Sequence, residues 1–388
     1  MKATCWHGVK DVRIDNVPDP EILNPHDAII EVKKSAICGS DLHLYHGYIP
    51  TMKKGDVLGH EFCGEVVAVG SEVKKAKVGD RVVVPFTISC GTCHYCSQGL
   101  FALCDNTNPN GALQKKMIGY PTAGLYGYSH GYGGYAGGQS QFVRVPFADT
   151  DTLQIPEGLS YEQALFLSDI YPTGFMAADN CNIRPGDTVA IWGCGPVAQF
   201  AIKSALMLGA GRVIAIDRWQ YRLDMAAQHG ATVLNYEEVD VLEALEELTG
   251  GLGPNSVIDA VGMEAHGDSI DAVYDEAAQK LKVENDRSHA LRQAIKACGK
   301  GGTVSIPGVY SGLVDKFPLG VAFAKGLTFK MGQTHMQKYM GRCMELIVEG
   351  KIDTTSVISH RISLDDVPQA YDTFAKKEDN AMKYVLTP

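Results

Sequence analysis

Residues 187–217, DTVAIWGCGPVAQFAIKSALMLGAGRVIAID, constrain the fold more than any other part of the sequence. An apolar strand-like run leads into a glycine turn, an amphipathic helical segment and a second apolar run that ends at Asp217. Strand, helix and strand in this order are typical of a parallel βαβ unit. Further short apolar runs follow at residues 255–262, 302–310 and 327–334. We therefore predict an α/β domain with a doubly wound parallel sheet.

The glycine turn has the chemistry of a dinucleotide-binding turn. It comprises Gly193, Cys194, Gly195, Pro196, Val197 and Ala198, and it joins a strand to a helix. Gly193 permits the tight turn, Gly195 lets the backbone approach a pyrophosphate, and the helix N-terminus offers amide groups and a dipole. Ala198 stands where a third glycine is common. The turn predicts a bound dinucleotide at the start of this helix.

The residue at the end of the second strand indicates which dinucleotide is preferred. A carboxylate at Asp217 can accept hydrogen bonds from both hydroxyls of an adenosine ribose, and it repels a 2′-phosphate. This favours NAD over NADP. Arg218 follows directly and keeps NADP open as the alternative.

Four closely spaced cysteines predict a metal site. Residues 90–104, CGTCHYCSQGLFALC, have the spacing C-x2-C-x2-C-x7-C, which comprises Cys90, Cys93, Cys96 and Cys104. Four thiolates in a turn-rich segment suit a closed, structural zinc site. Four unrelated core cysteines would not produce two consecutive CxxC spacings, so an iron–sulfur cluster is the main alternative.

A second set of potential ligands is dispersed along the chain. Asp169 lies in the mostly apolar run LFLSDIYPTG, where a buried carboxylate needs a nearby cation. Taken alone, Cys38 could be a small buried residue and His60 a core histidine. Together, Cys38, His60 and Asp169 provide three ligands and leave the fourth zinc position open, as a catalytic site requires.

The stretch GHEFCGEVVAVGSEV, residues 59–73, matches the pattern GHE-x2-G-x5-G-x2-V without a gap. With CGSDLH, the four cysteines and GCGPVA, it resembles the zinc-dependent medium-chain dehydrogenase/reductase family, the alcohol dehydrogenases. The resemblance covers almost the whole chain. It implies a GroES-like, β-rich catalytic zinc-binding domain in residues 1–167 and 333–388, and an NAD-binding Rossmann domain in residues 168–332. LSDIYPTG and YAGGQSQFVRVPFAD further resemble the formaldehyde dehydrogenase branch.

The resemblance assigns roles around the catalytic zinc. Cys38, His60 and Asp169 are implied as its ligands, with Glu61 behind them as an occasional ligand. Asp41 is implied to orient His60 through its other ring nitrogen. Many alcohol dehydrogenases are expected to carry a cysteine at the position of Asp169.

The resemblance also assigns the proton relay and the cofactor contacts. Ser40 is implied to accept the substrate proton, which then passes through the nicotinamide ribose to His43 at the surface. The implied cofactor contacts are Thr173, Val309 and Gln333 near the nicotinamide, Arg222 near the adenosine ribose, Val261 and Gly262 near the adenine, and Lys383 at the pyrophosphate. Gly39 departs from many members, which place an arginine there.

We therefore expect hydride transfer from an alcohol or aldehyde hydrate to NAD, with two zinc ions per chain. Formaldehyde, or a thiol adduct of it, is the first candidate substrate. A general alcohol or polyol dehydrogenase, and an aldehyde dismutase with tightly bound NAD, are the alternatives. A retired dehydrogenase that only binds nucleotide should have lost zinc ligands or relay residues, which this chain retains.

Charge and apolar patterning limit the partners. A formal net charge of −10 without a long basic run argues against nucleic acid. No apolar run approaches the roughly 18 residues of a spanning helix, so we expect a cytoplasmic protein with no membrane partner. The family resemblance implies a homodimer or homotetramer. Residues 105–140, rich in Gly and Tyr, predict a long loop. The charged helical stretch at 263–298 is interpreted as a surface insertion, an oligomer contact or a cover over the cofactor.

Overall fold

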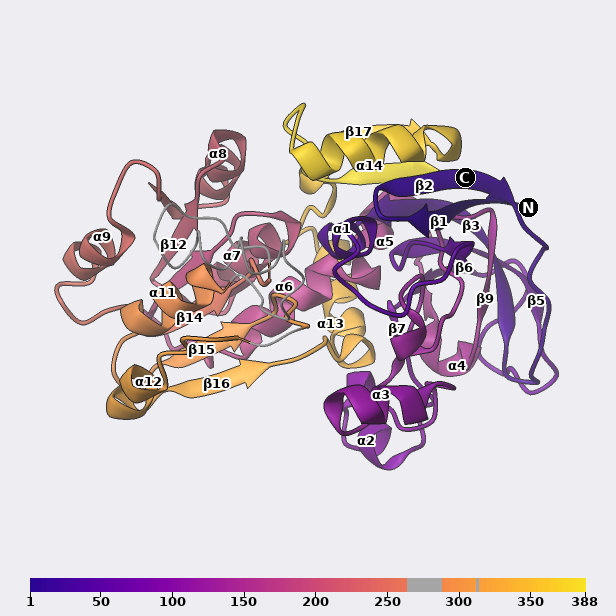
Figure 1. Ribbon diagram of the computed structural model, residues 1–388, viewed down its shortest axis with the longest axis horizontal. Helices are drawn as coiled ribbons and strands as arrows, with labels where there is room; N and C mark the ends of the chain where they lie inside the picture. Colours follow the sequence, from indigo (N-terminus) through magenta and orange to yellow (C-terminus); the bar gives the residue numbers. More distant parts are fainter. Residues whose placement is uncertain (264–287, 312–313) are drawn as a thin grey trace. The chain divides into compact units, whose positions relative to one another are not determined.

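The computed structural model describes residues 1–263, 288–311 and 314–388 (Figure 1). The chain divides into two compact units, the first formed by Met1–Pro172 and Thr334–Pro388 and the second by Thr173–Gln333. The sequence predicted the first boundary after residue 167. Because the observed boundary follows Pro172, Asp169 belongs to the first unit.

The first unit is rich in β-structure. Its described strands are β1 (Lys2–Gly8), β2 (Asp11–Asn16), β3 (Ala28–Ile37), β4 (Asp56–Val57), β5 (Phe62–Val69), β6 (Arg81–Val84), β7 (Thr87–Ile88), β8 (Gly124–Leu125), β9 (Phe142–Val145), β10 (Leu153–Gln154), β17 (His360–Ser363) and β18 (Tyr384–Thr387). The main sheet has the order β10-β6-β5-β3-β18-β17, and β9 also pairs with β3. Smaller sheets are formed by β2-β1-β4 and by β7-β8. The β-branched runs predicted at 28–37 and 61–69 form β3 and β5.

Strand register brings distant residues to one end of the main sheet. Ser35 of β3 lies opposite Phe62 of β5, and Ile37 of β3 lies opposite Tyr384 of β18. The residues just beyond these pairs therefore meet. They are Cys38 after β3, Glu61 before β5 and Lys383 before β18.

Short helices complete the first unit. They are α1 (Gly39–Tyr45), α2 (His94–Ser97), α3 (Gly111–Ile118), α4 (Ala148–Asp151), α5 (Tyr161–Leu165), α13 (Met336–Val348) and α14 (Val367–Lys376), with 3-10 turns η1 (Phe101–Leu103), η2 (His130–Tyr132), η3 (Phe166–Ser168), η4 (Thr355–Val357) and η5 (Leu364–Asp366). The predicted loop at 105–140 is partly wrong, because it contains α3, β8 and η2. Helix α6 (Ile170–Asp179) begins in the first unit and ends in the second.

The second unit is a doubly wound α/β domain, as predicted. Its described strands are β11 (Thr188–Trp192), β12 (Arg212–Asp217), β13 (Thr232–Asn235), β14 (Ser256–Asp259), β15 (Thr303–Ile306) and β16 (Thr328–Met331). They form one parallel sheet in the order β13-β12-β11-β14-β15-β16. Its described helices are α7 (Pro196–Met207), α8 (Gln220–Gln228), α9 (Val241–Leu248), α11 (His289–Ala297) and α12 (Leu319–Lys325).

Helices cover both faces of this parallel sheet. Alternate residues of β11 point to opposite faces. Val189 and Ile191 pack in one apolar cluster with residues of α6, α7 and α8, whereas Ala190 and Trp192 pack in another with residues of α9, α11 and α12. The buried, nearly continuous apolar strands follow from this two-sided cover.

Part of one prediction falls outside the described residues. Of the helical stretch predicted at 263–298, residues 264–287 are not described, and α11 forms its end. Within the described chain, no helix has both the length and the apolar character needed to span a bilayer.

Candidate metal centres and dinucleotide site

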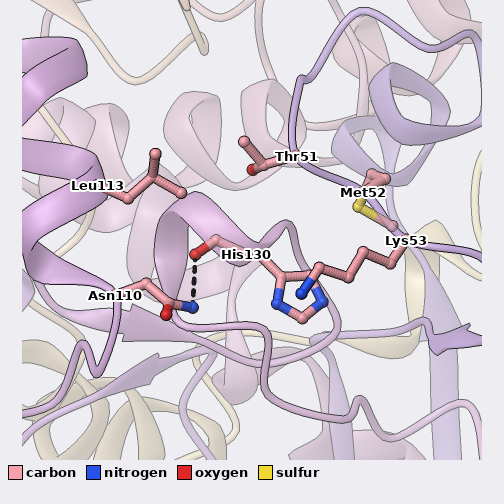
Figure 2. Close-up of a pocket in the computed structure, with 6 residues that line it drawn as sticks. All are labelled: Thr51, Met52, Lys53, Asn110, Leu113 and His130. Atoms are coloured by element: carbon pink, nitrogen blue, oxygen red, sulfur yellow. Dashed lines mark hydrogen bonds between the residues drawn. The ribbon is translucent and has the colours of Figure 1, made fainter.

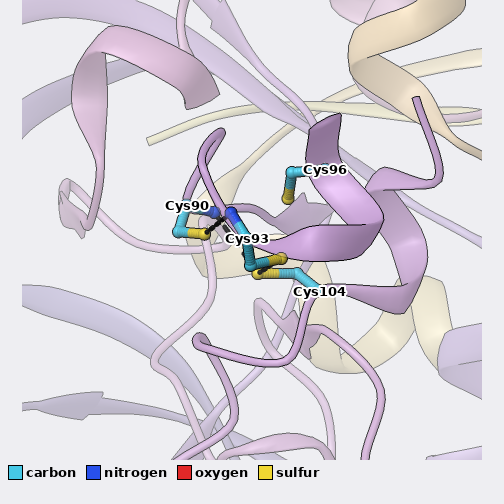
Figure 3. A group of neighbouring side chains, drawn as sticks. All are labelled: Cys90, Cys93, Cys96 and Cys104. Atoms are coloured by element: carbon cyan, nitrogen blue, oxygen red, sulfur yellow. Dashed lines mark hydrogen bonds between the residues drawn. The ribbon is translucent and has the colours of Figure 1, made fainter. Parts of the chain in front are cut away.

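The four closely spaced cysteines come together in the first unit. Figure 3 shows Cys90, Cys93, Cys96 and Cys104, whose sulfur atoms all lie within 4.8 Å of one another. Cys90 follows β7, Cys93 caps α2, Cys96 lies on α2 and Cys104 follows η1. All eleven cysteines of the chain are free of disulfides. The cluster is therefore a set of four available thiols.

Backbone amides donate to sulfur atoms of this cluster, and at Cys90 they favour the thiolate. The Cys93 N–H donates to Cys90 Sγ at 3.3 Å, and the Cys90 N–H donates to Cys104 Sγ at 3.4 Å. Burial raises the pKa of Cys90, but amide donors from Thr92 and Cys93 outweigh it and lower that pKa to about 6. Four converging sulfurs with amide donors fit a closed, tetrahedral zinc site.

The dispersed ligands form a second buried cluster, also in the first unit. Ligand atoms of Cys38, His60, Glu61 and Asp169 all lie within 4.8 Å of one another. Asp169 Oδ2 is 3.3 Å from His60 Nε2 and 3.6 Å from Cys38 Sγ. Asp169 lies between η3 and α6 and is only 8% exposed. One sulfur, one imidazole nitrogen and one carboxylate, all buried, fit a zinc ion with an open position.

Lys383 has a partner that the sequence did not predict. Its ammonium forms an ion pair with Oε1 of Glu61, and both side chains are almost wholly buried. Burial alone would lower the pKa of Lys383, yet Cys38 and Glu61 raise it above its ordinary value. Burial raises the pKa of Glu61, and Lys383 opposes that rise. Contact of Lys383 with a pyrophosphate stays a prediction.

Asp41 lies beside the second ring nitrogen of His60, and its role in orienting that ring stays a prediction. Asp41 Oδ1 is 3.1 Å from His60 Nδ1, and the Cys38 N–H donates to Asp41 Oδ2 at 2.9 Å. Burial lowers the pKa of His60, but Asp41 and Asp169 raise it well above its ordinary value. Asp41 thus contacts two of the ligand-bearing residues.

The two residues of the expected proton relay lie on α1. Ser40 Oγ is 3.3 Å from His60 Nε2, so this hydroxyl is adjacent to the ligand set. His43 was expected at the surface, and this is wrong, because its side chain is buried with 7% exposure. Most of α1 is buried with it, since Asp41, Leu42, Leu44 and Tyr45 are buried too, and α1 also contacts α14.

The predicted dinucleotide turn has the backbone geometry that its glycines suggest. Gly193 has φ +84°, and a Cβ there would lie 3.0 Å from Val261 Cγ2. At Gly195 the nearest atom to an added Cβ is Arg222 Nη1 at 3.9 Å, so the backbone is open on that side. Pro196 is the first residue of α7, whose N-terminus meets the turn. An open backbone at a helix N-terminus fits a pyrophosphate.

Asp217 connects the glycine turn to the end of β12. Its Oδ2 accepts from the Cys194 N–H at 2.7 Å, and its Oδ1 accepts from the Arg218 N–H at 2.7 Å and the Trp219 N–H at 3.2 Å. The Arg218 guanidinium lies over the Trp219 ring and 3.2 Å from Glu237 Oε1. Asp217 is therefore held rigidly, and Arg218 is already paired with an acid.

Val261, Gly262 and Val309 lie together near Gly193. The Met263 N–H donates to the Val309 carbonyl at 2.9 Å, and a Cβ on Gly262 would lie 2.6 Å from the same oxygen. Asp259 supports this turn, because its Oδ1 accepts from the Val261 N–H at 3.0 Å. These residues follow the carboxyl ends of parallel strands, where ligands bind in such folds.

For two of the expected nicotinamide contacts, Thr173 and Gln333, the structure gives only their position in the chain and their burial or neighbours. Thr173 is buried at the start of the second unit, and its neighbour Gly174 lies so close to α7 that an added Cβ would be 2.7 Å from the Val197 carbonyl. Gln333 ends the second unit, just after β16. The roles of Thr173 and Gln333 stay predictions.

Comparison with known proteins assigns the family. The model of the alcohol dehydrogenase GroES-like domain matches residues 24–157, and that of the zinc-binding dehydrogenase domain matches residues 196–282. AdhB of Bacillus subtilis (strain 168), an uncharacterised zinc-type alcohol dehydrogenase-like protein, is 41% identical over all of both chains. The chain belongs to the zinc-type alcohol dehydrogenase family.

Other members of this family match over the same length. The glutathione-independent formaldehyde dehydrogenase of Bacillus subtilis (strain 168) is 34% identical, and the alignment covers 100% of this chain and 97% of the relative. The solved structure of alcohol dehydrogenase TADH from Thermus sp. ATN1 is similar, with a TM-score of 0.83 and 35% identity over 100% of this chain and 99% of that one. The expected family and fold class are confirmed.

In this member of the zinc-type alcohol dehydrogenase family, the first unit also has a surface hollow. It measures about 320 Å³ and is lined by Thr51, Met52, Lys53, Asn110, Leu113 and His130 (Figure 2). Asn110 Nδ2 donates to the His130 carbonyl at 2.9 Å, and His130 Nε2 is 3.0 Å from Asp56 Oδ1. None of these lining residues belongs to either metal cluster, so the hollow has no assigned part in the reaction.

The sequence prediction missed some residues that this site uses. Gln139 carries a buried amide that contacts Asp41, and Asp259 holds the turn at Val261. Gln139 lies in a Gly-rich segment without periodicity, so only three-dimensional contacts reveal it. Asp259 ends a strand at the carboxyl edge of the sheet, and that position was a usable signal.

Proposed function

We propose that the protein is an NAD-dependent zinc dehydrogenase that oxidises a small alcohol or an aldehyde hydrate, and that it holds two zinc ions per chain. The observation that carries the proposal is the buried cluster of Cys38, His60 and Asp169, with Glu61 beside it. Three ligands leave a position for the substrate oxygen. Zinc held there supplies a Lewis acid that polarises this oxygen.

The residues around the cluster supply proton transfer and orientation. Ser40, adjacent to His60 Nε2, would accept the proton of the substrate hydroxyl, and His43 on the same helix would receive it next. Asp41 keeps His60 oriented. If the glycine turn at Gly193 holds NAD, the cofactor would supply the acceptor for a hydride from the substrate carbon, and the substrate would thereby lose two electrons.

NAD is the proposed cofactor because of the charges at the end of β12. Asp217 ends β12, and its carboxylate would repel the 2′-phosphate of NADP if the adenosine ribose binds at this strand end. Arg218, the residue that favours NADP, has its guanidinium next to Glu237 and against Trp219. Both observations support recognition of an unphosphorylated ribose.

Formaldehyde hydrate is the substrate that we propose first. Oxidation of a carbonyl compound by hydride transfer requires the hydrate or a thiol adduct, whose carbon carries both a hydroxyl and a hydrogen. A relative at 34% identity is named a glutathione-independent formaldehyde dehydrogenase, which favours the hydrate over a glutathione adduct. Relatives named as alcohol dehydrogenases keep simple alcohols and polyols as the second candidate class.

Metal and nucleotide analysis of Asp169→Ala tests the proposal. The parent should contain about two zinc ions per chain, one for each cluster, and should reduce NAD with formaldehyde faster than with ethanol or sorbitol. Asp169→Ala should lose activity and one zinc ion. Asp179 is exposed at the end of α6, so the control variant Asp179→Ala should keep its activity and its two zinc ions. An active Asp169→Ala protein with its full zinc content would contradict the ligand assignment.

The same preparations separate the alternative functions. Nucleotide released on denaturation at about one per chain, with aldehyde conversion in the absence of added NAD, would favour a dismutase. Higher kcat/KM for ethanol or sorbitol than for formaldehyde would favour the general dehydrogenase. A parent with only one zinc would remove the basis of the catalytic site.

A further inference from the structure

The side chain of Gln139 is fully buried beside the catalytic cluster and uses both ends of its amide. Its Nε2 donates to Asp41 Oδ2 at 3.3 Å and to the Ala36 carbonyl at 3.2 Å. Its Oε1 accepts from the Tyr371 hydroxyl at 3.1 Å. Gln139 is 0% exposed, and so is Tyr371. The amide is thus fixed in one orientation, with its NH₂ group toward Asp41.

The backbone of Gln139 is fixed as firmly as its side chain. Its N–H donates to the Leu58 carbonyl at 3.0 Å, and its carbonyl accepts from the Thr4 N–H at 2.8 Å. The neighbouring chain passes so close that a Cβ on Gly59 would lie 2.4 Å from Gln139 Cγ. A Cβ on Gly138 would lie 2.3 Å from the Phe62 ring. The small residues therefore allow this segment to pack directly against the chain that carries His60.

Asp41 lies between Gln139 and the metal ligands and contacts both. One carboxylate oxygen of Asp41 faces His60 Nδ1 at 3.1 Å, and the other accepts from the Cys38 N–H at 2.9 Å. Gln139 donates to this second oxygen. Without that donor, a buried carboxylate loses one of its few partners and can rotate away from His60.

We propose that Gln139 is a positioning residue for the catalytic metal site, and that Tyr371 keeps its amide in the productive orientation. The residue acts through Asp41 and touches neither substrate nor metal. A reversed amide would place Oε1 against the Asp41 carboxylate, and the Tyr371 donor prevents this. The inference rests on the proposed function, because it assumes that the cluster holds zinc.

A comparison of zinc retention tests the proposal, with Gln139→Met as the main variant. Methionine has a similar length but cannot donate, so the Asp41 carboxylate loses its partner. Loss of a partner beyond the metal ligands typically weakens metal affinity about 10- to 100-fold. We expect this loss for the catalytic zinc when the zinc-loaded protein is titrated with a chelator. Zinc in the four-cysteine cluster serves as the internal reference and should be released as in the parent.

A nearby glutamine provides the matched control. Gln141 lies on the same segment, and its Oε1 accepts from the Lys2 N–H at the surface. Gln141→Met should leave both zinc affinities unchanged. Tyr371→Phe, which preserves the ring, should weaken the catalytic zinc in the same direction by a smaller factor. If Gln139→Met does not fold, Tyr371→Phe carries the test.

Cobalt substitution adds a readout that simple packing loss would not change. The visible absorption of Co(II) at the catalytic site reports ligand geometry, and it should shift in Gln139→Met but not in Gln141→Met. Unchanged spectra and affinities within about twofold of the parent would overturn the proposal and leave Gln139 as a packing residue. A parent without the second zinc would instead refute the proposed function.

Discussion

Substitution of Lys383 by methionine tests the buried ion pair beside the catalytic cluster. Lys383 and Glu61 are 1% and 0% exposed. Removing one partner leaves the other charge buried without compensation, which typically costs about 3–5 kcal/mol. For a unit of this size, each kcal/mol lowers Tm by about 2 °C. We therefore expect Lys383→Met to lower Tm by about 6–10 °C.

Calorimetry at neutral pH measures this effect on protein whose catalytic cluster has been emptied with a chelator, because a zinc ion there would itself compensate the Glu61 charge, and two variants serve as controls. Glu61→Gln combined with Lys383→Met removes both charges and should recover most of the lost stability, since replacement of a whole buried pair is often neutral. Lys351→Met breaks an exposed pair, Lys351 with Glu349, and should change Tm by no more than about 1–2 °C. A Lys383→Met protein as stable as the parent would refute the reasoning, as would a double variant no better than the single one.

The pH dependence of Lys383→Met has a definite sign. Burial raises the pKa of Glu61, and Lys383 opposes this rise in the parent. Without the ammonium, the folded-state pKa lies further above the unfolded value, so the folded state binds more protons between these two values. The free energy of unfolding then falls as pH rises through that interval. The difference in the free energy of unfolding between the parent and Lys383→Met should therefore be smallest in acid. It should reach a plateau above the folded-state pKa of Glu61.

Two further predictions concern the other sites. Cys96→Ser should lower the zinc content from about two ions per chain to one and reduce Tm, because the closed site loses a ligand. Cys343→Ser changes a buried cysteine outside the clusters, and metal analysis should show that it retains both ions. Glu237→Gln should raise the ratio of kcat/KM for NADP to kcat/KM for NAD several-fold, because Arg218 loses its acidic partner. The control Glu238→Gln should leave this ratio unchanged. Equal ratios in the two variants would contradict this account.

Local patterns predicted much of the fold. β-Branched runs placed β3 and β5, and the strand, glycine turn and helix around Gly193 placed the parallel sheet. The cysteine spacing predicted the four-sulfur cluster, and an acidic residue in an apolar run indicated a role for Asp169. In each case the signal lies within a few consecutive residues. Such signals can be recognised in the sequence alone because they do not depend on residues far along the chain.

Features that depend on long-range packing were not predicted. The pairing of Lys383 with Glu61 follows from the register of β3, β5 and β18, which no local pattern specifies. The burial of α1, which carries His43, arises in a fold where α1 contacts α14, far along the chain. Helix α3 is short and lies in a Gly- and Tyr-rich segment, so its periodicity was too weak to detect. Gln139 lies in YAGGQSQFVRVPFAD, which indicated the branch of the family but no role for this amide, because an amide is informative only once its partners are known.

The place of β18 in the main sheet has a consequence for how the protein is made. β18 lies between β3 and β17 and pairs with β3, yet the whole second unit separates β3 from β18 in the sequence. Strand β9 pairs with residues 28–31 of β3, but residues 35–37 of β3 have no strand partner on the β18 side until residues 384–386 have been synthesised. The second unit can fold earlier, because its sheet is continuous in the sequence. High contact order makes closure of the first unit the slow step, and a ribosome that stalls before β18 would expose an aggregation-prone strand edge.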